Sequence, residues 1–386
     1  MTVDFRYLAV AATGFCVFLN LYAPQSLLPS LASEFGVGAT AISTVITAST
    51  LAIALTAPFT GAIADVLGRK RVISAAMFAV VVPTALVSMA SDVHQLVVWR
   101  FIQGLLLPPI FAVVIAYIGD EWPPSQATSV VGFYGAGASL GGFAGRFLTG
   151  LLADIFGWRL AIFSLAVLTL VGALAVTSSL PRERKFVRSV GIVSSIVQML
   201  RHLQNPHLVA TYAVGFGVLF NFIATFTYIS FYLAAPPYNF SATLLGAIFV
   251  TYLVGVVAAP AAGRAVGKFG RRGFVGGVLV LWACGIVLTL APSVAAIVAG
   301  LSLCAGAGVL CQTVSTGYVT TIAREGRSSA VGLYVTSFYF GGAVGAFLPG
   351  IAYERAGWPA CVAMVLIMLV IMGLIVRLAW TPAPVR

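Results

Sequence analysis

The chain has 386 residues, of which 60% are hydrophobic and only 8% are charged, and its mean hydropathy is +1.05. A soluble domain carries about 25% charged residues, so this composition excludes a soluble globular protein and indicates an integral membrane protein. The net charge of +11 would suit nucleic-acid binding, but the basic residues gather between long apolar segments, which indicates a membrane partner and no nucleic acid.

Twelve segments are long and apolar enough to cross a bilayer, which takes about 20 residues. We predict helices over residues 6–28, 39–64, 72–91, 94–118, 126–153, 158–180, 207–233, 242–266, 273–291, 294–322, 328–353 and 358–380. Turn or charge signals such as "GRKR", "DEWPPSQ" and "GKFGRR" separate them. The first stretch is too long for a signal-peptide core, so we expect it to be a spanning helix.

The basic residues predict the orientation of these helices. An even number of helices puts both termini on one side, and with that side inside, inner segments hold 17 of the 21 Lys and Arg residues. The outer loops hold only Arg159 and Arg355, while Arg100 and Arg146 fall inside helices. The imbalance predicts a multi-pass protein of the cell (inner) membrane with both termini in the cytoplasm and basic loops facing anionic lipid.

The two halves of the chain resemble each other. The stretch "GFCVFLN" at 14–20 resembles "GFGVLFN" at 215–221, and "GLLADIFGW" at 150–158 resembles "GIAYERAGW" at 350–358. The register holds at an offset of 200 to 202 residues over most of the chain, which predicts two pseudo-symmetric six-helix bundles around a central cavity. We therefore expect an all-α membrane protein with bundles at 1–180 and 207–386. Between them, at 181–206, lies a cytoplasmic linker with apolar residues at helical spacing, either an interfacial helix or a simple tether.

Three motifs resemble one known family. The stretch "GAIADVLGRKR" at 61–71 resembles the loop signature between helices 2 and 3 of the major facilitator superfamily, and "RFIQG" at 100–104 resembles its helix 4 motif. The stretch "GASLGGFAGR" at 137–146 resembles the helix 5 motif of its exporters, with Gly142 in place of a proline and Arg146 in place of the last glycine. The whole chain resembles the twelve-helix drug and sugar efflux branch of this family, which is the drug:proton antiporter-like branch.

The resemblance implies an inner gate at the loop signature. The gating residues would be Gly61, Asp65, Gly68, Arg69 and Lys70. The two glycines permit close contact and a sharp turn, and the resemblance implies that Asp65 pairs with Arg69 and a neighbouring helix end. The alternative is that this cluster only fixes the topology.

Glycine rows on two helices predict close helix packing. The glycines in question are Gly137, Gly141, Gly145, Gly341 and Gly345. Small residues four apart let helices approach closely in lipid.

Two arginines lie at the depth of the membrane, where a charge costs ~2.5–3.5 kcal/mol. Arg146 either lines the cavity and favours negative charge or snorkels toward Asp154, eight residues away. Arg100 either lines the cavity or binds backbone carbonyls of neighbouring helices. None of the ten carboxylates falls at mid-membrane, so we expect a neutral or anionic substrate.

Further cavity candidates are polar residues near the middle of predicted helices. They are Asn20, Gln103, Asn221, Tyr228, Gln312 and Tyr334, with Tyr22 and Gln25 as weaker ones. Asn20 and Asn221 occupy equivalent repeat positions, and each could bind substrate or join helices by hydrogen bonds.

The sequence thus predicts a secondary active transporter that works by alternating access. The leading hypothesis is proton-driven export of a small organic solute from the cytoplasm by a monomer. The alternative is import or exchange of an organic anion, and a more remote one is a non-transporting membrane sensor. The cysteines have no ligand spacing, and HExxH, GxSxG and P-loop motifs are absent, so we expect no enzyme activity, cofactor or metal.

Overall fold

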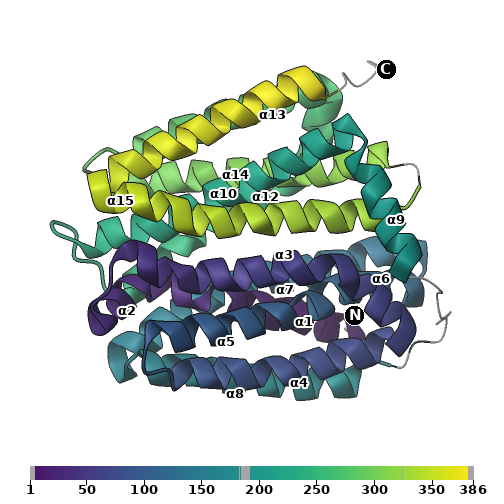
Figure 1. The fold of residues 1–386 in the computed structure, drawn as a ribbon, viewed down its shortest axis with the longest axis horizontal. Coiled ribbons are helices and arrows are strands. Elements are labelled where there is room, and N and C mark those ends of the chain that lie inside the picture. Colours follow the sequence, from purple (N-terminus) through teal and green to yellow (C-terminus); the bar gives the residue numbers. More distant parts are fainter. Residues whose placement is uncertain (1–4, 182, 184–191, 324, 381–386) are drawn as a thin grey trace. The chain divides into compact units, whose positions relative to one another are not determined.

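The structure is a computed structural model that describes residues 5–181, 183, 192–323 and 325–380. Helices are the only regular secondary structure in these ranges (Figure 1). From the N-terminus they are α1 Phe5–Tyr22, η1 Ala23–Ser26, α2 Leu28–Phe35, α3 Ala39–Leu67, α4 Arg69–Ser88, α5 Val93–Leu106, α6 Pro108–Glu121, α7 Pro124–Phe156 and α8 Trp158–Ser179. They continue as α9 Ile192–Leu203, α10 Pro206–Ala234, α11 Ala242–Ala247, η2 Ile248–Thr251, α12 Tyr252–Ala258, η3 Ala259–Ala261, α13 Ala262–Leu288, α14 Val294–Ile322 and α15 Arg327–Ala379.

The predicted twelve membrane helices are confirmed once the bends are considered. Nine helical stretches of the described chain are long and apolar enough to span a bilayer. Two of them hold two spans each, because 242–288 turns at Gly270 (φ 69°) and α15 turns at Ala356 and Gly357. The 33-residue α7 adds the twelfth; its seven glycines and Arg146 make it less apolar than the others.

Contacts between residues divide the chain into two compact units. The first unit comprises Met1–Val37, Thr44–Ile192 and Leu233–Phe249, and the second comprises Gly38–Ser43, Val193–Tyr232 and Val250–Arg386. Each unit therefore holds one short segment from the opposite predicted bundle. The bundle limits at residues 180 and 207 remain a prediction; α9 lies within the predicted linker, whose residues 184–191 are outside the described part of the chain.

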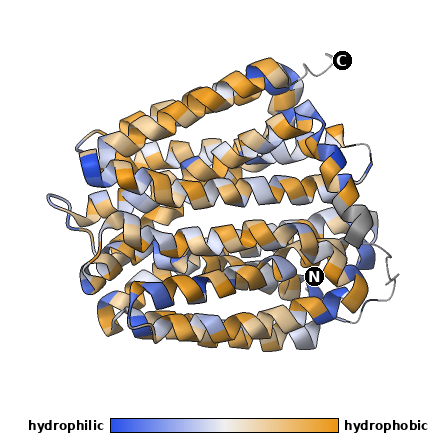
Figure 2. Cartoon of the chain, viewed as in Figure 1, coloured by the Kyte–Doolittle hydropathy of each residue, from blue (hydrophilic) through white to orange (hydrophobic). Residues whose placement is uncertain are grey.

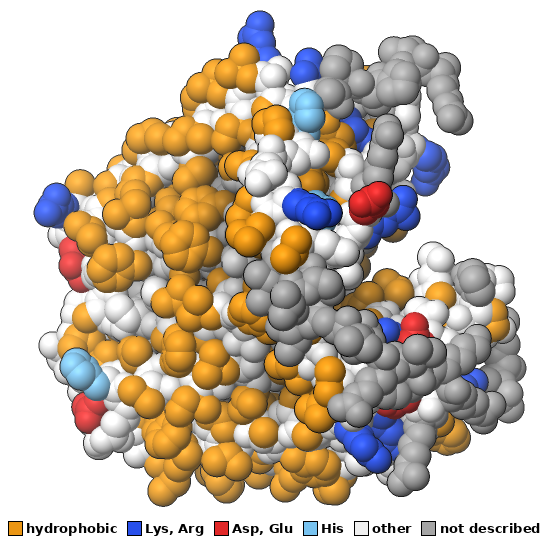
Figure 3. Space-filling model, turned by 45° about the vertical axis from the view of Figure 1, so that its right-hand side comes forward, with side chains coloured by type: hydrophobic (Ala, Val, Ile, Leu, Met, Phe, Trp, Pro, Cys, Tyr) orange, Lys and Arg blue, Asp and Glu red, His pale blue; other side chains and the backbone are white. Residues whose placement is uncertain are grey.

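The surfaces of the helices match a lipid environment. Figure 2 shows hydrophobic residues along the lengths of the helices and hydrophilic residues mainly near their ends. In the space-filling view, broad hydrophobic areas are bordered by Lys, Arg, Asp and Glu side chains (Figure 3). Large apolar residues such as Val171, Val257 and Leu378 are more than half exposed, which is the expected side-chain distribution where lipid is the solvent.

The glycine rows lie where two helices touch backbone to backbone. A Cβ placed on Gly137, Gly141 or Gly145 of α7 would overlap a carbonyl oxygen of α1. In the second unit, a Cβ on Gly341 or Gly345 of α15 would likewise overlap a carbonyl oxygen of α10. The helices can approach so closely only because these positions carry no side chain.

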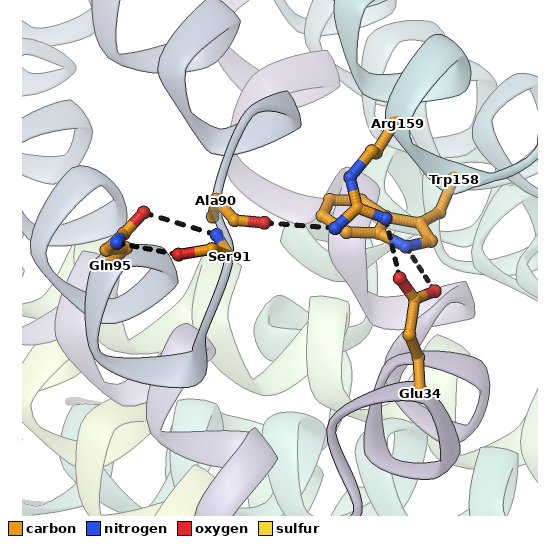
Figure 4. A network of polar contacts seen from close by, with 6 residues as sticks. All are labelled: Glu34, Ala90, Ser91, Gln95, Trp158 and Arg159. Atoms are coloured by element: carbon orange, nitrogen blue, oxygen red, sulfur yellow. Dashed lines mark hydrogen bonds and ion pairs between the residues drawn. The ribbon is translucent and has the colours of Figure 1, made fainter.

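A polar clamp joins three segments of the first unit near its predicted outer side (Figure 4). Glu34, at the end of α2, accepts hydrogen bonds from Trp158 Nε1 at 2.5 Å and from Arg159 Nη1 at 2.6 Å. Arg159 Nη2 also donates to the carbonyl of Ala90 at 3.2 Å. This clamp joins α2, the turn that follows α4 and the start of α8, all of which belong to the first predicted bundle.

Candidate functional site

The first membrane helix is interrupted near its predicted outer end. Regular α-helix stops at Tyr22, and a short 3₁₀ turn over Ala23–Ser26 follows. Pro24 explains the interruption, because proline has no backbone N–H to donate to the carbonyl four residues earlier, at Asn20. The break leaves polar backbone groups inside the protein, where each needs a partner.

Arg100 on α5 supplies these partners. Its guanidinium group has five N–H donors, and five acceptors of the first unit surround it. They are Asn20 O (2.8 Å), Leu21 O (2.5 Å), Ser49 Oγ (2.9 Å), Val45 O (3.5 Å) and Gln103 Oε1. The residue is only 1% exposed. This geometry matches the structural alternative, in which Arg100 binds backbone carbonyls of neighbouring helices.

Asn20 and Gln103 belong to the same buried network. Asn20 Nδ2 donates to Thr169 Oγ1 at 2.8 Å, and Thr84 Oγ1 donates to Asn20 Oδ1 at 2.9 Å. Gln103 Nε2 donates to Thr84 Oγ1 at 2.7 Å. A cavity of about 10 Å³ lies beside these side chains, room for one water molecule at most. In this arrangement the network joins α1, α4, α5 and α8, and leaves no space for an organic solute.

Arg146 lies on the other side of the same break. Its Nε and Nη2 donate to Gln25 Oε1 at 2.9 and 2.8 Å, and Nη1 donates to the carbonyl of Gly142 at 2.7 Å. The rings of Tyr22 and Phe249 lie 4.3 and 4.1 Å from the guanidinium carbon. Each of these four partners is neutral, so none of them cancels the positive charge.

The segment 242–249 covers Arg146 within the first unit. A Cβ on Gly246 would meet the carbonyl oxygen of Arg146 at 2.5 Å, and the Phe249 ring stacks on the guanidinium. Together with Tyr22 and Gln25, this segment leaves Arg146 3% exposed. Asp154, one expected partner of Arg146, accepts hydrogen bonds from Ala242 N at 3.2 Å and Thr243 N at 2.9 Å.

The second unit does not repeat this site. Its α10 continues from Pro206 to Ala234 without interruption, and Thr225 stands where the repeat aligns Pro24. Asn221 Nδ2 lies 3.5 Å from Met372 Sδ, and its Oδ1 has no hydrogen-bond partner among the described residues. Leu301 and Ala346 stand at the positions aligned with Arg100 and Arg146. The sequence repeat thus carries a buried cationic site in one half only.

The remaining cavity candidates are spread over the second unit. Tyr228 donates a hydrogen bond to the carbonyl of Ala346 on α15. Tyr334 is buried against Gly215 of α10, and Gln312 on α14 is half-buried. The contacts of the two tyrosines join α10 and α15 within one unit.

Two of the residues predicted to form a gate, Asp65 and Arg69, take part in an ion-pair cluster of the first unit. Arg69 Nη2 lies 3.5 Å from Asp65 Oδ1, and Arg69 Nη1 pairs with Asp120 at the end of α6. Gly68 has φ 93°, so it makes the sharp turn that the sequence predicts, and Glu183 accepts a hydrogen bond from Lys70 N at 3.1 Å. A Cβ on Gly61 would meet no described atom within 4 Å, so the close contact expected there is absent from the described residues.

Sequence reasoning did not single out Ser49, Thr84, Thr169 or Phe249. All four are buried residues of types that are common in apolar helices, and no sequence motif marks their positions. The proline in "YAPQS" at 22–26 is the signal that could have located the site, because a Pro-interrupted spanning helix often marks a transport site.

The carboxylates stay away from the buried site. Asp4 lies outside the described residues, and the other nine of the ten carboxylates are exposed or partly exposed. In the described part of the chain, no group of three or more His, Cys, Asp and Glu side chains is placed to hold a metal ion. The site can therefore offer cationic, amide, hydroxyl and aromatic groups to a ligand.

Twelve apolar helices in two related sets, with a polar site at a broken helix, define a membrane transport protein. The chain belongs to the Major Facilitator Superfamily, whose family model matches residues 10–250 and 214–386. The chain is 30% identical over 370 residues to the inner membrane transport protein YnfM of Escherichia coli K12, covering 94% of this chain and 88% of that protein.

Other relatives agree with this family. The chain is 27% identical over 373 residues to the uncharacterized MFS-type transporter YybF of Bacillus subtilis 168, covering 96% and 92% of the two chains. Its fold is similar to the crystal structure of the nucleoside transporter NupG, with a TM-score of 0.81, 13% identity and coverage of 97% and 100%.

Proposed function

We propose that this transporter exports a small, uncharged or anionic organic solute from the cytoplasm by alternating access, driven by the proton gradient. The observation that carries the proposal is the buried Arg146, held by neutral partners at the break of the first helix. The transporter would act as a monomer in the inner membrane, with both termini in the cytoplasm.

The charge distribution supports a neutral or anionic substrate. A buried cation favours a negatively charged ligand and repels a positively charged one, and the low local dielectric strengthens both effects. A bulky cation would instead need a buried carboxylate, and every described carboxylate is at least partly exposed.

Of the two arginines, Arg146 is the better candidate for contact with substrate. Arg100 already has an acceptor for each of its five donors. A substrate that replaced these acceptors would leave the carbonyls of Asn20 and Leu21 on α1 without their hydrogen-bond donor. Arg146 is covered in part by the segment 242–249, which belongs to the second predicted bundle. Movement of that segment away from α7 would uncover Arg146.

The membrane potential supports the outward direction for an anion. A negative interior drives anions outward by ~2.3 kcal/mol per charge per 100 mV. Exchange for an entering proton would add the pH gradient to this force. Nothing in the comparisons favours the alternative of an anion importer.

The decisive experiment is flux in proteoliposomes with an imposed pH gradient, using matched anionic, neutral and cationic solutes. We expect flux of anionic or neutral solutes and inhibition by collapse of the gradient. Arg146→Ala should abolish flux of anions, whereas Arg377→Ala, at an exposed arginine near the end of α15, should leave it unchanged. Flux restricted to cations, or anion flux that persists in Arg146→Ala, would overturn the proposed substrate class, and absence of all flux would favour a sensor.

A further inference from the structure

A carboxylate fastens the segment 242–249 to α7. Asp154 accepts hydrogen bonds from Ala242 N (3.2 Å), Thr243 N (2.9 Å) and Thr243 Oγ1 (2.6 Å). One turn earlier on the same face of α7, a Cβ on Gly150 would overlap the carbonyl oxygen of Ala242. The pair Gly150 and Asp154 thus lets the segment approach and then binds its backbone.

The second unit contains a related arrangement, in which a carboxylate accepts a hydrogen bond from one backbone N–H. Glu354 Oε1 accepts a hydrogen bond from Thr40 N at 2.9 Å, at the start of α3. One turn earlier on α15, a Cβ on Gly350 would overlap Tyr228 Oη and would also meet Thr40 Oγ1 at 2.8 Å and Thr40 Cα at 3.0 Å. Gly38, just before α3, also lies directly against the Glu354 carboxylate.

The repeat in the sequence relates these two contacts. The stretch "GLLAD" at 150–154 aligns with "GIAYE" at 350–354 at an offset of 200, and the bound stretches are "SAT" at 241–243 and "GAT" at 38–40. In each case the carboxylate and the segment that it binds come from opposite predicted bundles. These two segments, 38–43 and 233–249, are also the ones that the compact units exchange.

The segment held by Asp154 is the one that covers the candidate site. It runs along α7 from Asp154 toward Arg146, with Ala242 at Gly150 and Gly246 at the Arg146 carbonyl. Phe249 then stacks on the guanidinium group. The segment cannot leave Arg146 without first separating from Asp154 or bending.

We propose that Asp154 and Glu354 are a matched pair of outer clasps, positioning residues that hold the predicted outer side closed and so control access to Arg146. Each clasp consists of a Gly-x-x-x-Asp/Glu turn that binds the first residues of a helix from the other predicted bundle. The inference rests on the proposed alternating access, because only a transporter that opens on this side must release the clasps.

The test measures the outer accessibility of a thiol beneath each clasp. Ala242→Cys and Ala39→Cys place thiols at side chains that are 5% and 8% exposed. Both are made in a Cys284→Ser background, since Cys284 is exposed while the other four cysteines are buried. Intact cells are treated with a membrane-impermeant charged thiol reagent. We expect Asp154→Ala to raise labelling at position 242, and Glu354→Ala to raise it at position 39, by about tenfold or more. The first change removes three charge-assisted hydrogen bonds and the second removes one.

Glu34→Ala is the matched control, because Glu34 is an exposed carboxylate whose partners all lie within the first predicted bundle; it should leave both rates unchanged. Gly150→Ala tests the same clasp without changing charge and should also raise labelling at position 242. Asp154→Asn, which keeps an acceptor, should give an intermediate rate and replaces Asp154→Ala if that variant does not fold.

Unchanged labelling in the folded clasp variants would overturn the proposal, as would an equal increase with Glu34→Ala. The assay needs no substrate. Increased labelling without flux of any solute would support the clasps and contradict the proposed transport. Flux with unchanged labelling would contradict the clasps alone.

Discussion

A single side-chain oxygen of Gln25 accepts hydrogen bonds from both Nε and Nη2 of Arg146, at 2.9 and 2.8 Å. Gln25 lies in the 3₁₀ turn that follows the break in α1, and Arg146 lies on α7. The contact holds the guanidinium in place without cancelling its charge, because the amide is neutral.

This relationship allows the charge of Arg146 to be tested without removing the side chain. Gln25→Glu places a carboxylate of the same shape beside the guanidinium, so the protein should fold and the site should become electrically neutral. We expect the affinity for an anionic solute to fall by at least about tenfold. Ligand-induced shifts of the unfolding temperature measure this affinity.

Gln25→Leu is the matched control, because it removes the hydrogen bonds and keeps the positive charge. It should lower stability and retain the preference for anions. Equal anion binding by wild type and Gln25→Glu would show that substrate does not sense the charge of Arg146.

Arg100 should be essential for stability because it serves the carbonyls freed by Pro24. Arg100→Lys leaves three donors on a compact ammonium group, which cannot reach all five acceptors. We expect a loss of at least about 2 kcal/mol in unfolding free energy from orphaned buried groups.

Pro24→Ala should compensate in part, because alanine restores a backbone N–H that can bond to Asn20 O. The double-mutant cycle, measured by unfolding in detergent, should therefore show a favourable interaction between the two changes. Strictly additive effects would contradict the link between the proline break and Arg100.

Two adjacent glycines of α7 should respond differently to alanine. A Cβ on Gly141 would overlap the Phe15 carbonyl of α1, so Gly141→Ala should force the helices apart and cost about 1–3 kcal/mol. A Cβ on Gly142 would meet Arg146 Nη1 at 3.6 Å and Phe18 Cβ at 3.9 Å, which are ordinary contacts. Gly142→Ala should be neutral or stabilising, because alanine favours helix. The unfolding temperatures of the two variants measure the difference. A similar loss of stability in both variants would argue against backbone packing at Gly141.

The Asp154 clasp should survive mild acid. Burial alone would raise the pKa of Asp154, but hydrogen bonds from Thr243, Ser241 and Ala242 outweigh it and lower the pKa below its usual value. A depressed pKa means that the carboxylate stabilises the fold above the unfolded value of about 3.9, and that this contribution is lost as pH falls through the folded value.

The difference in unfolding temperature between wild type and Asp154→Ala should accordingly stay constant from pH 8 to about pH 5 and shrink below about pH 4. A difference that vanished near neutral pH would mean that Asp154 titrates there and that the clasp is a proton switch.

The class of protein and its helices follow from the sequence, because hydrophobicity and segment length are local properties that decide whether a segment is stable as a helix in the bilayer. The twelve spans, the glycine rows and the sharp turn at Gly68 are of this kind. So is the loop signature at 61–71, whose short spacing brings Asp65 near the end of α3 close to Arg69 at the start of α4.

The roles of the buried polar residues depend on which hydrogen-bond partners the fold places beside each of them. Asn20 and Asn221 are equivalent in sequence, yet only Asn20 meets hydroxyl and amide partners, because Thr84, Thr169 and Gln103 lie on helices packed against it. Their aligned counterparts in the second unit do not form such a network around Asn221.

The same reason separates Arg146 from Asp154. A spacing of eight residues puts both on one face of α7, as the sequence indicates. The spacing does not determine which segments pack against that face. The tertiary structure brings Gln25 and two aromatic rings to Arg146 and the backbone of Ala242 and Thr243 to Asp154. Sequence alone determined where the charges stand along the helix; the packing of distant segments decided what each one binds.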